Sequence, residues 1–412
     1  MGRVMGVLDV AVVGAGPVGL TAALALAGRG IAVTVFEEDA LLSTEWRAST
    51  FHPPTLEIAC DLGIADAMLA EGLIARTYQI RDRRDGLIAE FDFGLLADET
   101  DYPFRLQLEQ YKYTQIISDM LGGRHPEVGV RMGEGITGVA QHADAAVLTT
   151  ASGERVEARW VLAADGARST VRKALGTSFD GLTYDHRYLV LSIDYPVETL
   201  LPGICAVNYI ADPDEHLLIL RTPDVWRVVV AVRPELRADE VLTDAYVAGR
   251  LRGLFGDHPE LPLRERKIYS VHQRVAGNFR QDRVLLLGDA AHVNSPMGGM
   301  GLNGGIHDAF DLSVQLGKVL LDGAGPEVLD AWAHRRRKAA IEAVQELTHR
   351  TTTEMAEQDE AERLGYRRRM SEIAGDPALA KAWMLDAAMI SNVRAHGLPP
   401  RPAGRGPGAG AN

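Results

Sequence analysis

The sequence predicts an α/β fold in which one parallel-sheet domain is discontinuous along the chain, a mostly β domain is inserted into it, and helices follow. Three observations lead to this prediction. A short apolar strand, a helix and a second strand fill about 30 residues from position 10. Alternating strands of antiparallel character dominate residues 185–233. A further apolar strand at 283–289 precedes a pattern that is helical from 301 to about 395.

The first unit comprises a strand at 10–13, a helix at 17–28 and a strand at 31–36. The run VAVV is short, apolar and mostly β-branched, which is typical of a buried parallel strand. The intervening segment is rich in Ala and Leu and therefore favours a helix. Elsewhere we expect helices at 54–72, 111–121 and 235–256, a strand-like piece at 77–93 with a turn at Asp85-Gly86, and strand pairs within 128–164.

These elements predict a domain organisation. The discontinuous domain comprises residues 1–75, 100–180 and 270–340, and the inserted domain comprises 76–99 and 181–269. Residues 341–398 are expected to form C-terminal helices. The tail 399–412, PPRPAGRGPGAGAN, is rich in Pro and Gly and is expected to be disordered.

Composition narrows the function classes. The net charge of −13, from 43 basic and 56 acidic residues, argues against a nucleic-acid partner. The apolar stretch 8–28 contains glycines and Pro17, which favour a strand, turn and helix over a leader, and no other run approaches a membrane span. The two cysteines, Cys60 and Cys205, exclude a disulfide framework and lack metal-ligand spacing. We therefore expect a cytoplasmic protein without a metal or a membrane partner.

The first chemical motif is Gly14-Ala15-Gly16-Pro17-Val18-Gly19, a GxGxxG between a strand and a helix. Gly14 permits the tight turn, Gly16 lets the backbone approach a pyrophosphate, and Gly19 lets the helix pack on the sheet. Free N–H groups and the helix dipole favour phosphate at the helix start. Glu37, at the end of the second strand, can accept hydrogen bonds from ribose hydroxyls. The motif predicts a dinucleotide but does not separate NAD from FAD.

Two later stretches of the sequence help to distinguish FAD from NAD. In VLAADGARSTVR, residues 161–172, a strand ends at Asp165-Gly166 before a helix begins. In VLLLGDAAHVNSPMGGMGLN, residues 284–303, a strand ends at Gly288-Asp289, and a glycine-rich loop leads into a helix. His292 in this stretch is expected to be structural rather than an acid or base.

With these three stretches in order over roughly residues 8–340, the chain resembles the single-component FAD-dependent aromatic hydroxylases, class A flavoprotein monooxygenases of the para-hydroxybenzoate hydroxylase type. The resemblance implies an α/β fold with a discontinuous Rossmann-like FAD-binding domain, an inserted, mostly β substrate domain and a C-terminal helical segment. It also implies FAD as cofactor, with NADH or NADPH as a transient electron donor. The absence of a second dinucleotide fingerprint agrees with transient binding.

The resemblance also assigns roles to residues. Asp289 would bind the ribityl chain of FAD, and Asp165-Gly166 is associated with FAD and nicotinamide binding. Arg47 matches an arginine near the phosphates and ribityl, although a surface arginine is the alternative. Gln110 matches a glutamine that contacts FAD, although it could simply cap a helix.

The glycine-rich loop is expected beside the flavin ring. The resemblance places Pro296, Met297 and Gly298 there, and the helix start at Gly301, Leu302 and Asn303 near the pyrimidine end. Backbone N–H groups of Leu302 and Asn303 would stabilise the negative charge of reduced flavin. Family members often have a small polar residue where this chain has Met297. The family's substrate contacts therefore cannot be assigned directly to residues of this chain. No catalytic side chain can be assigned from the sequence.

In the family, oxygen adds to reduced flavin, and the resulting C4a-hydroperoxide transfers oxygen to an aromatic ring. The expected substrates are thus a small or mid-sized aromatic compound and O2. Candidate substrate residues on the inserted sheet are Asn208, Tyr209, His216 and Arg221. Arg221 could hold a carboxylate or be paired on the surface.

Several alternatives stay open. Epoxidation, N-hydroxylation or alkene reduction could occur on the same fold, and a non-catalytic protein could retain FAD. A plain NAD-dependent dehydrogenase is disfavoured by the loop after Gly288-Asp289. The protein is expected to be a monomer or a homodimer.

Overall fold

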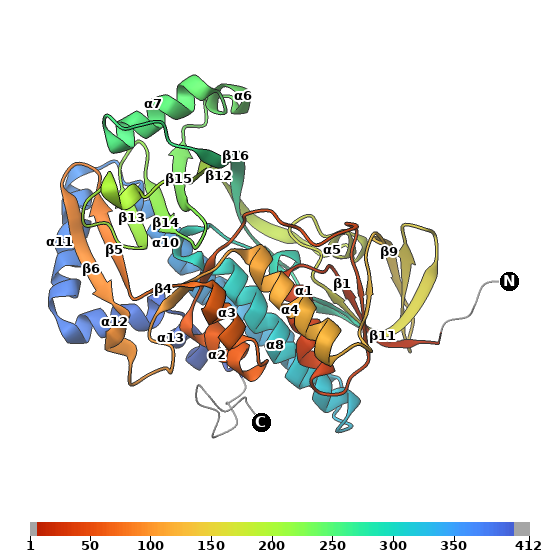
Figure 1. Ribbon diagram of the computed structural model, residues 1–412. Coiled ribbons are helices and arrows are strands. Elements are labelled where there is room, and N and C mark those ends of the chain that lie inside the picture. Colours follow the sequence, from red (N-terminus) through yellow and green to blue (C-terminus); the bar gives the residue numbers. More distant parts are fainter. Residues whose placement is uncertain (1–5, 399–412) are drawn as a thin grey trace.

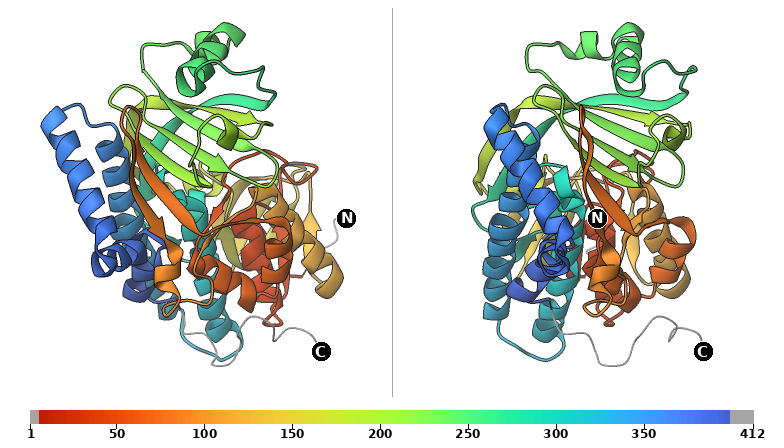
Figure 2. Two further views of the ribbon diagram at one scale, coloured as in Figure 1. Left: turned by 60° about the vertical axis from the view of Figure 1, so that its left-hand side comes forward. Right: turned by 90° about the vertical axis from the view of Figure 1, so that its left-hand side faces the viewer.

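A computed structural model describes residues 6–398, so the disorder expected for the tail 399–412 lies outside the described residues. Within that range the strands form two eight-stranded sheets and a smaller sheet of three strands. Figures 1 and 2 show the two large sheets in separate parts of the molecule, with helices around them. The predicted α/β fold with a mostly β insertion is confirmed.

The first sheet has the order β17-β18-β11-β1-β2-β8, and β10 and β9 extend it from β11. Its central strands β18, β11, β1, β2 and β8 run parallel and come from three distant parts of the chain. The strands are β1 (Leu8–Val13), β2 (Val33–Phe36), β8 (Gly129–Arg131), β9 (Ile136–Gln141), β10 (Ala146–Thr150), β11 (Arg155–Ala163), β17 (Arg280–Gln281) and β18 (Val284–Leu286).

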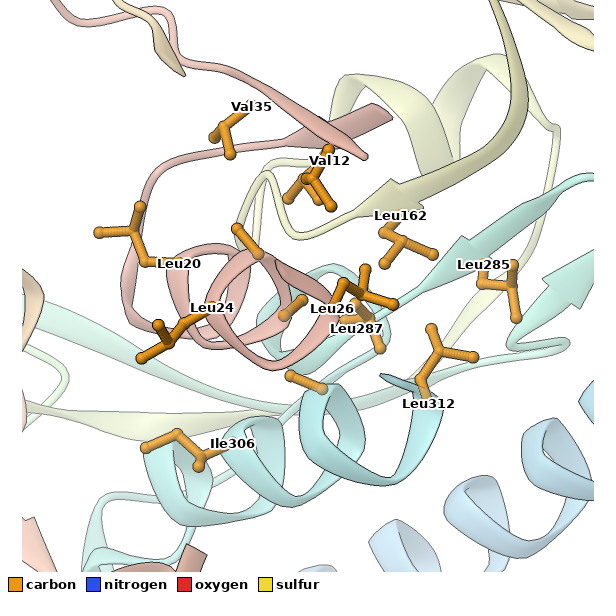
Figure 3. Close-up of a cluster of buried hydrophobic side chains, with 14 of the residues drawn as sticks. Val12, Leu20, Leu24, Leu26, Val35, Leu162, Leu285, Leu287, Ile306 and Leu312 are labelled. Carbon is orange, nitrogen blue, oxygen red and sulfur yellow. The ribbon is translucent and has the colours of Figure 1, made fainter. Parts of the chain in front are cut away.

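Helix α1 (Pro17–Ala27) lies between this sheet and helix α8 (Gly301–Leu320), and it also contacts α4 (Gln110–Arg124). Figure 3 shows side chains of α1 between the strands and α8. The labelled side chains are Val12, Val35, Leu162 and Leu285 from strands, Leu20, Leu24 and Leu26 from α1, Leu287, and Ile306 and Leu312 from α8. All are buried, so apolar burial joins segments almost 300 residues apart in sequence.

The second sheet has the order β19-β16-β12-β15-β14-β13-β5-β6. Only the β13–β5 pair is parallel among its described pairings. The strands are β5 (Thr77–Asp82), β6 (Gly86–Asp92), β12 (Phe179–Ile193), β13 (Val207–Ala211), β14 (Leu217–Arg221), β15 (Trp226–Val232), β16 (Leu263–Ala276) and β19 (His292–Val293). Strand β19 follows β18 in sequence, so it links the two sheets.

Two helical groups cover this second sheet, and a small sheet of β3 (Thr50–Phe51), β7 (Arg105–Gln107) and β4 (Leu73–Ala75) lies next to it. On one face, α7 (Asp244–Phe255) packs against Ile219 and Val228. On the other face, the C-terminal helices contribute to a cluster with Tyr188 and Tyr209. These helices are α10 (Glu346–Met355), α11 (Glu360–Gly375), α12 (Pro377–Ala387) and α13 (Ile390–His396). They follow α9 (Glu327–Ala339), which packs against α8 in the core of the first sheet, and the π-helical turn η5 (Ala340–Gln345).

Two predicted helices are interrupted. The helix expected at 54–72 divides into α2 (Pro53–Asp61) and α3 (Ala65–Glu71), because Gly63 between them has φ +73°. The helix expected at 235–256 divides into α6 (Ala238–Val241) and α7, which begins anew where the Thr243 hydroxyl caps the N–H of Tyr246. Both breaks depend on local backbone geometry that apolar spacing does not reveal. No helix within residues 6–398 is long and apolar enough to cross a bilayer.

Candidate functional site

The glycine loop between β1 and α1 leaves open space at one glycine and none at two others. A Cβ on Gly14 would lie 2.5 Å from the Ala164 carbonyl oxygen, and one on Gly19 would lie 1.9 Å from the Gly14 oxygen. A Cβ on Gly16 would meet no atom within 4 Å. Pro17 opens α1, and no described side chain caps its first turn. The loop therefore presents unpaired N–H groups beside open space, which suits an anionic ligand.

Glu37 reaches this loop from the end of β2. Its Oε2 accepts a hydrogen bond from the Ala15 N–H at 2.6 Å, and its Oε1 accepts one from the Asp39 N–H at 3.0 Å. The side chain is half-buried. The structure thus brings together the glycine loop and the carboxylate that the sequence singled out.

Asp165 shapes the start of α5 (Thr170–Ala174). Its Oδ1 accepts a hydrogen bond from the Ser169 hydroxyl at 2.6 Å, and its Oδ2 accepts one from the Val171 N–H at 3.1 Å. At Gly166, which has φ +75°, an added Cβ would meet no atom within 4 Å. In this structure the Asp165 carboxylate organises its own loop, and the open space lies beside Gly166.

Sequence reasoning missed Arg172, which ties this loop to the next motif. It is buried, and it donates to the carbonyls of Ala290 at 2.9 Å and Ala167 at 2.8 Å. Its guanidinium lies 3.8 Å from the centre of the Phe179 ring. The partner in the next motif is remote in sequence, so no local pattern indicated the role.

Asp289 lies where β18 leads into the glycine-rich loop. Burial raises the pKa of its carboxyl, while the charges of His292 and Arg47 lower it. Its side chain nevertheless stays exposed. Because this carboxylate is exposed, it can accept hydrogen bonds from a ligand.

A buried network of charged and polar groups lies next to Asp289, around the Gly288 N–H. Asp308 Oδ1 accepts a hydrogen bond from Arg336 Nε at 2.7 Å, and Asp308 Oδ2 lies 2.8 Å from His292 Nε2 and accepts from the Gly288 N–H at 3.2 Å. All three side chains are buried. Burial raises the pKa of Asp308, but Arg336 and His292 hold it below its ordinary value. This geometry supports the structural role expected for His292.

Asn303 fixes the start of α8. Its Oδ1 accepts hydrogen bonds from the His52 N–H at 2.9 Å and the Thr55 hydroxyl at 2.7 Å. Its Nδ2 donates to the carbonyls of Thr50 at 2.9 Å and Gly299 at 2.7 Å. Both polar atoms of the Asn303 side chain are therefore hydrogen-bonded within the protein. A ligand at the start of α8 would bind to the backbone N–H groups of the first turn. No described side chain caps that turn, which begins at Gly301 and includes Leu302.

The loop before α8 depends on His52, another residue that sequence reasoning missed. His52 Nε2 donates to the Gly298 carbonyl at 2.9 Å. Burial and the charge of Arg105 hold the pKa of His52 well below its ordinary value, so the ring is neutral. Gly298 has φ +86°, while Pro296 is half-buried and Met297 is fully buried against the second sheet. The loop is thus held in one conformation between the two sheets.

Arg47 and Gln110 lie on neighbouring segments. Arg47 is exposed and pairs with Glu45 at 2.9 Å, and its charge lowers the pKa of Asp289. Gln110 begins α4, and its N–H donates to the Ala48 carbonyl at 3.0 Å. Both residues therefore lie close to the other candidate cofactor contacts, although Arg47 is also the surface arginine of the alternative interpretation.

The four candidate substrate residues fall on opposite faces of the second sheet. Tyr209 and His216 lie on the face that packs against Met297, since Tyr209 shares that cluster and His216 Nε2 lies 2.8 Å from the Tyr188 hydroxyl. Burial, with a contribution from His186, lowers the pKa of His216 to about 3. Both side chains are buried on the sheet face that also packs against Met297.

Asn208 and Arg221, the other two substrate candidates, lie on the opposite face of the second sheet. Successive strand residues point to opposite faces, and these two share the face of Ile219, which packs on α7. Asn208 donates to the carbonyls of Cys205 at 2.7 Å and Ile219 at 3.2 Å, and Arg221 lies 5.9 Å from the centre of the Trp226 ring. The sequence placed them on the correct sheet, but strand membership alone does not say which face turns toward the loop.

Comparison with known proteins gives a family for this geometry. A family model described as FAD binding domain matches residues 7–347. The para-nitrophenol 4-monooxygenase of Pseudomonas sp. (strain WBC-3) is 34% identical over 93% of this chain and 96% of its own. The 6-hydroxy-3-succinoylpyridine 3-monooxygenase HspB of Pseudomonas putida is 32% identical over 81% of this chain and 86% of its own.

A solved structure gives the same result in three dimensions. The crystal structure of p-nitrophenol 4-monooxygenase PnpA from Pseudomonas putida DLL-E4 superposes with a TM-score of 0.89 at 32% identity. The match covers 94% of this chain and 98% of that chain. The likeness therefore extends over both sheets and the C-terminal helices.

Proposed function

The chain belongs to the FAD-binding family of aromatic monooxygenases, and we propose that its substrate is a single aromatic ring bearing a hydroxyl group. It is an enzyme with FAD as cofactor and NADH or NADPH as electron donor. When bound, reduced FAD supplies the activation of O2. Support for the substrate class comes from the two curated relatives, whose names give a nitrophenol and a hydroxypyridine as their substrates.

We propose that the glycine loop Gly14, Gly16 and Gly19, with Pro17, holds the pyrophosphate of FAD at the start of α1. Glu37 would accept hydrogen bonds from ribose hydroxyls. The observation that carries this assignment is the open space at Gly16 beside an uncapped helix start, while Gly14 and Gly19 are closely packed. A cradle with one open glycine is what close approach of a pyrophosphate requires.

The other FAD contacts follow from the same geometry. Asp289 would bind the ribityl hydroxyls, with Gly288 allowing close packing on α1, since a Cβ there would lie 2.9 Å from Val18. Arg47, Gln110, Asp165 and Gly166 would complete the site. The first turn of α8, at Gly301, Leu302 and Asn303, would face the pyrimidine end of the flavin, where its N–H groups favour negative charge.

The substrate would lie between the loop Pro296, Met297 and Gly298 and the sheet face that carries Tyr209 and His216. The protein's own contribution is to orient the ring, exclude water and keep the loop in place through His52 and Asn303. The division of the chain into FAD-binding and substrate-binding domains at the predicted boundaries is part of this proposal. We further propose a cytoplasmic monomer or homodimer that does not bind nucleic acid.

A paired substitution tests the cofactor assignment. Gly16→Ala places a methyl group where the pyrophosphate approaches, so we expect it to cost about 1–3 kcal/mol of FAD binding free energy. Gly122→Ala is the control, because this glycine in α4 also has no atom within 4 Å of an added Cβ. FAD affinity is measured by titrating the apoproteins and following flavin fluorescence. Equal FAD affinity in the two variants would refute the assignment.

Turnover tests the reaction. A panel of single-ring phenols, including 4-nitrophenol, is added to the FAD-loaded enzyme with NADH or NADPH. We expect at least one phenol to stimulate NAD(P)H consumption and to yield a product with one added oxygen atom by mass spectrometry. If none does, the proposed substrate class is wrong.

A further inference from the structure

Arg105 is a buried arginine without a carboxylate partner among the described residues. Only 2% of its surface is exposed. It donates to the Tyr209 hydroxyl at 3.2 Å and to the Ala387 carbonyl at 3.1 Å, and its Nε has no hydrogen-bond partner in residues 6–398. Because a guanidinium stays protonated, the protein buries a positive charge that only neutral groups contact.

Two aromatic rings fix the direction of this guanidinium. Its central carbon lies 4.7 Å from the centre of the Tyr78 ring and 5.3 Å from that of Phe93. Rings at these distances attract a cation and restrict its side-chain rotation. They do not neutralise its charge. Arg105 is therefore held ready for an anion that the described part of the chain does not provide.

Gln107 adds a second free donor on the same side. It lies two residues after Arg105 on β7, so both side chains project from one face of the strand. Its Oε1 accepts a hydrogen bond from Thr50 at 3.1 Å, and its buried Nε2 has no partner in the described range. Two buried donors that lack acceptors are costly unless a ligand supplies the acceptors.

This pair of donors borders the proposed substrate region. Arg105 contacts Tyr209, which lies on the loop-facing side of the second sheet. The charge of Arg105 also lowers the pKa of His52, whose Nε2 holds the Gly298 carbonyl. On the Gln107 side, Thr50 packs against Gly299, where an added Cβ would lie 3.0 Å from Thr50 Cβ. Arg105 and Gln107 thus lie between Tyr209 and the loop at 296–299.

We propose that Arg105 and Gln107 bind an anionic oxygen of the aromatic substrate, a phenolate or a ring carboxylate. This inference rests on the proposed function, because it concerns the same substrate site. The anion would accept hydrogen bonds from Arg105 and Gln107 and neutralise the buried charge. The neutral His52 adds no second positive charge, so the selectivity for an anion is assigned to Arg105.

Binding of matched ligand pairs tests the proposal. FAD-loaded protein is titrated with 4-nitrophenol above the pH at which it ionises and with its uncharged methyl ether, 4-nitroanisole. Benzoate and methyl benzoate form the second pair. Flavin absorbance and calorimetry report binding without turnover. We expect the wild type to prefer the anion of at least one pair.

The variants separate charge recognition from packing. Arg105→Met should weaken binding of the preferred anion about tenfold to a hundredfold and leave its uncharged partner nearly unchanged. Gln107→Leu should weaken the same anion several-fold. Arg221→Met is the matched control, because this arginine lies on the opposite face of the second sheet, and it should change neither affinity. If Arg105→Met does not fold, Gln107→Leu decides by the same comparison of anion with uncharged partner.

Three results overturn the proposal. Arg105→Met that weakens charged and uncharged ligands equally would show a packing role. Arg105→Met that lowers FAD affinity while anion preference persists would show that the guanidinium serves the cofactor. A wild type that binds aromatic ligands without preferring an anion would refute this inference alone, whereas a wild type that no aromatic compound stimulates would refute the proposed function.

Discussion

Two buried arginines differ in what surrounds them. Arg336, on α9, and Arg105, on β7, are each 2% exposed. Arg336 pairs with Asp308 at 2.7 Å in a network that also includes His292 and the Gly288 N–H. Among the described residues, Arg105 donates hydrogen bonds only to a hydroxyl and a carbonyl, and it contacts two aromatic rings. Arg336 also leaves one nitrogen, Nη1, without a partner among the described residues, yet its charge is compensated.

The role of a buried arginine depends on whether a counter-ion lies beside it. A compensated charge stabilises the fold, because removing either partner leaves the other buried and unpaired. An uncompensated charge costs stability and is tolerated where a ligand completes it. Burial alone does not distinguish the two arginines. The charges of their neighbours distinguish them, which supports a stabilising role for Arg336 and the proposed substrate-binding role for Arg105.

The largest expected effect is at Asp308. Asp308→Asn leaves Arg336 buried without its counter-ion and weakens the support of Gly288, so we expect the free energy of unfolding to fall by about 3–5 kcal/mol. Urea denaturation of the FAD-free protein measures this. A loss below about 1 kcal/mol would contradict the assignment of the network to stability.

The pH dependence of the same variant provides a control. Because the folded-state pKa of Asp308 is lowered, the network stabilises the protein fully above the ordinary carboxyl pKa of about 3.9, and this contribution is lost as the pH falls through the folded value. The wild type should therefore lose stability more steeply than Asp308→Asn as the solution is acidified below that pH. Parallel curves would show that another group dominates acid unfolding.

The next effect concerns cofactor binding rather than the fold. Asp289→Asn keeps the shape of the side chain but removes the charge that strengthens its hydrogen bonds, so we expect the FAD dissociation constant to rise about tenfold. The folded-state pKa of Asp289 is raised, so its ionised form is disfavoured by folding at neutral pH. The FAD-free variant should accordingly be at least as stable as the wild type. Fluorescence titration and urea denaturation check the two parts, and a destabilised variant with normal FAD affinity would reverse the assignment.

The residues proposed to bind the cofactor could be located from the sequence because their signals are local. Gly14, Gly16 and Gly19 follow a buried strand, and such turns require glycine in a fixed spacing. Asp289 and Asn303 likewise fall within one continuous loop and helix start. The α/β fold could be predicted because the apolar residues of each strand follow a pattern within that strand's own sequence.

The substrate half was not predictable to the same degree. The direction of Asn208 and Arg221 depends on which sheet face meets the loop, and this is fixed by tertiary packing on α7. Arg105 lies on a strand of only three residues, and its partners Tyr209 and Ala387 are remote in sequence. The roles of Arg172 and His52 were not predicted for the same reason, because each side chain donates a hydrogen bond to a backbone carbonyl that is remote in sequence.

A smaller effect is expected at Arg105. Arg105→Met loses hydrogen bonds to Tyr209 and Ala387 but removes an uncompensated buried charge, so the opposing contributions should nearly cancel. We expect the free energy of unfolding without an aromatic ligand to change by less than about 1 kcal/mol. Urea denaturation alongside Asp308→Asn gives a direct comparison. A loss as large as that of Asp308→Asn would mean that the two arginines play the same structural role.

The smallest effect is expected at Arg221, the arginine that the sequence offered for substrate binding. It lies against Trp226 on the face that packs on α7, away from Met297 and Tyr209. Arg221→Ala should change the KM for the best aromatic substrate by less than about twofold, as surface substitutions usually stay within about 0.5 kcal/mol. Steady-state kinetics beside Arg105→Met would check this. A tenfold rise in KM at Arg221 with none at Arg105 would exchange the two assignments, because it would mean that the substrate approaches the opposite face of the sheet.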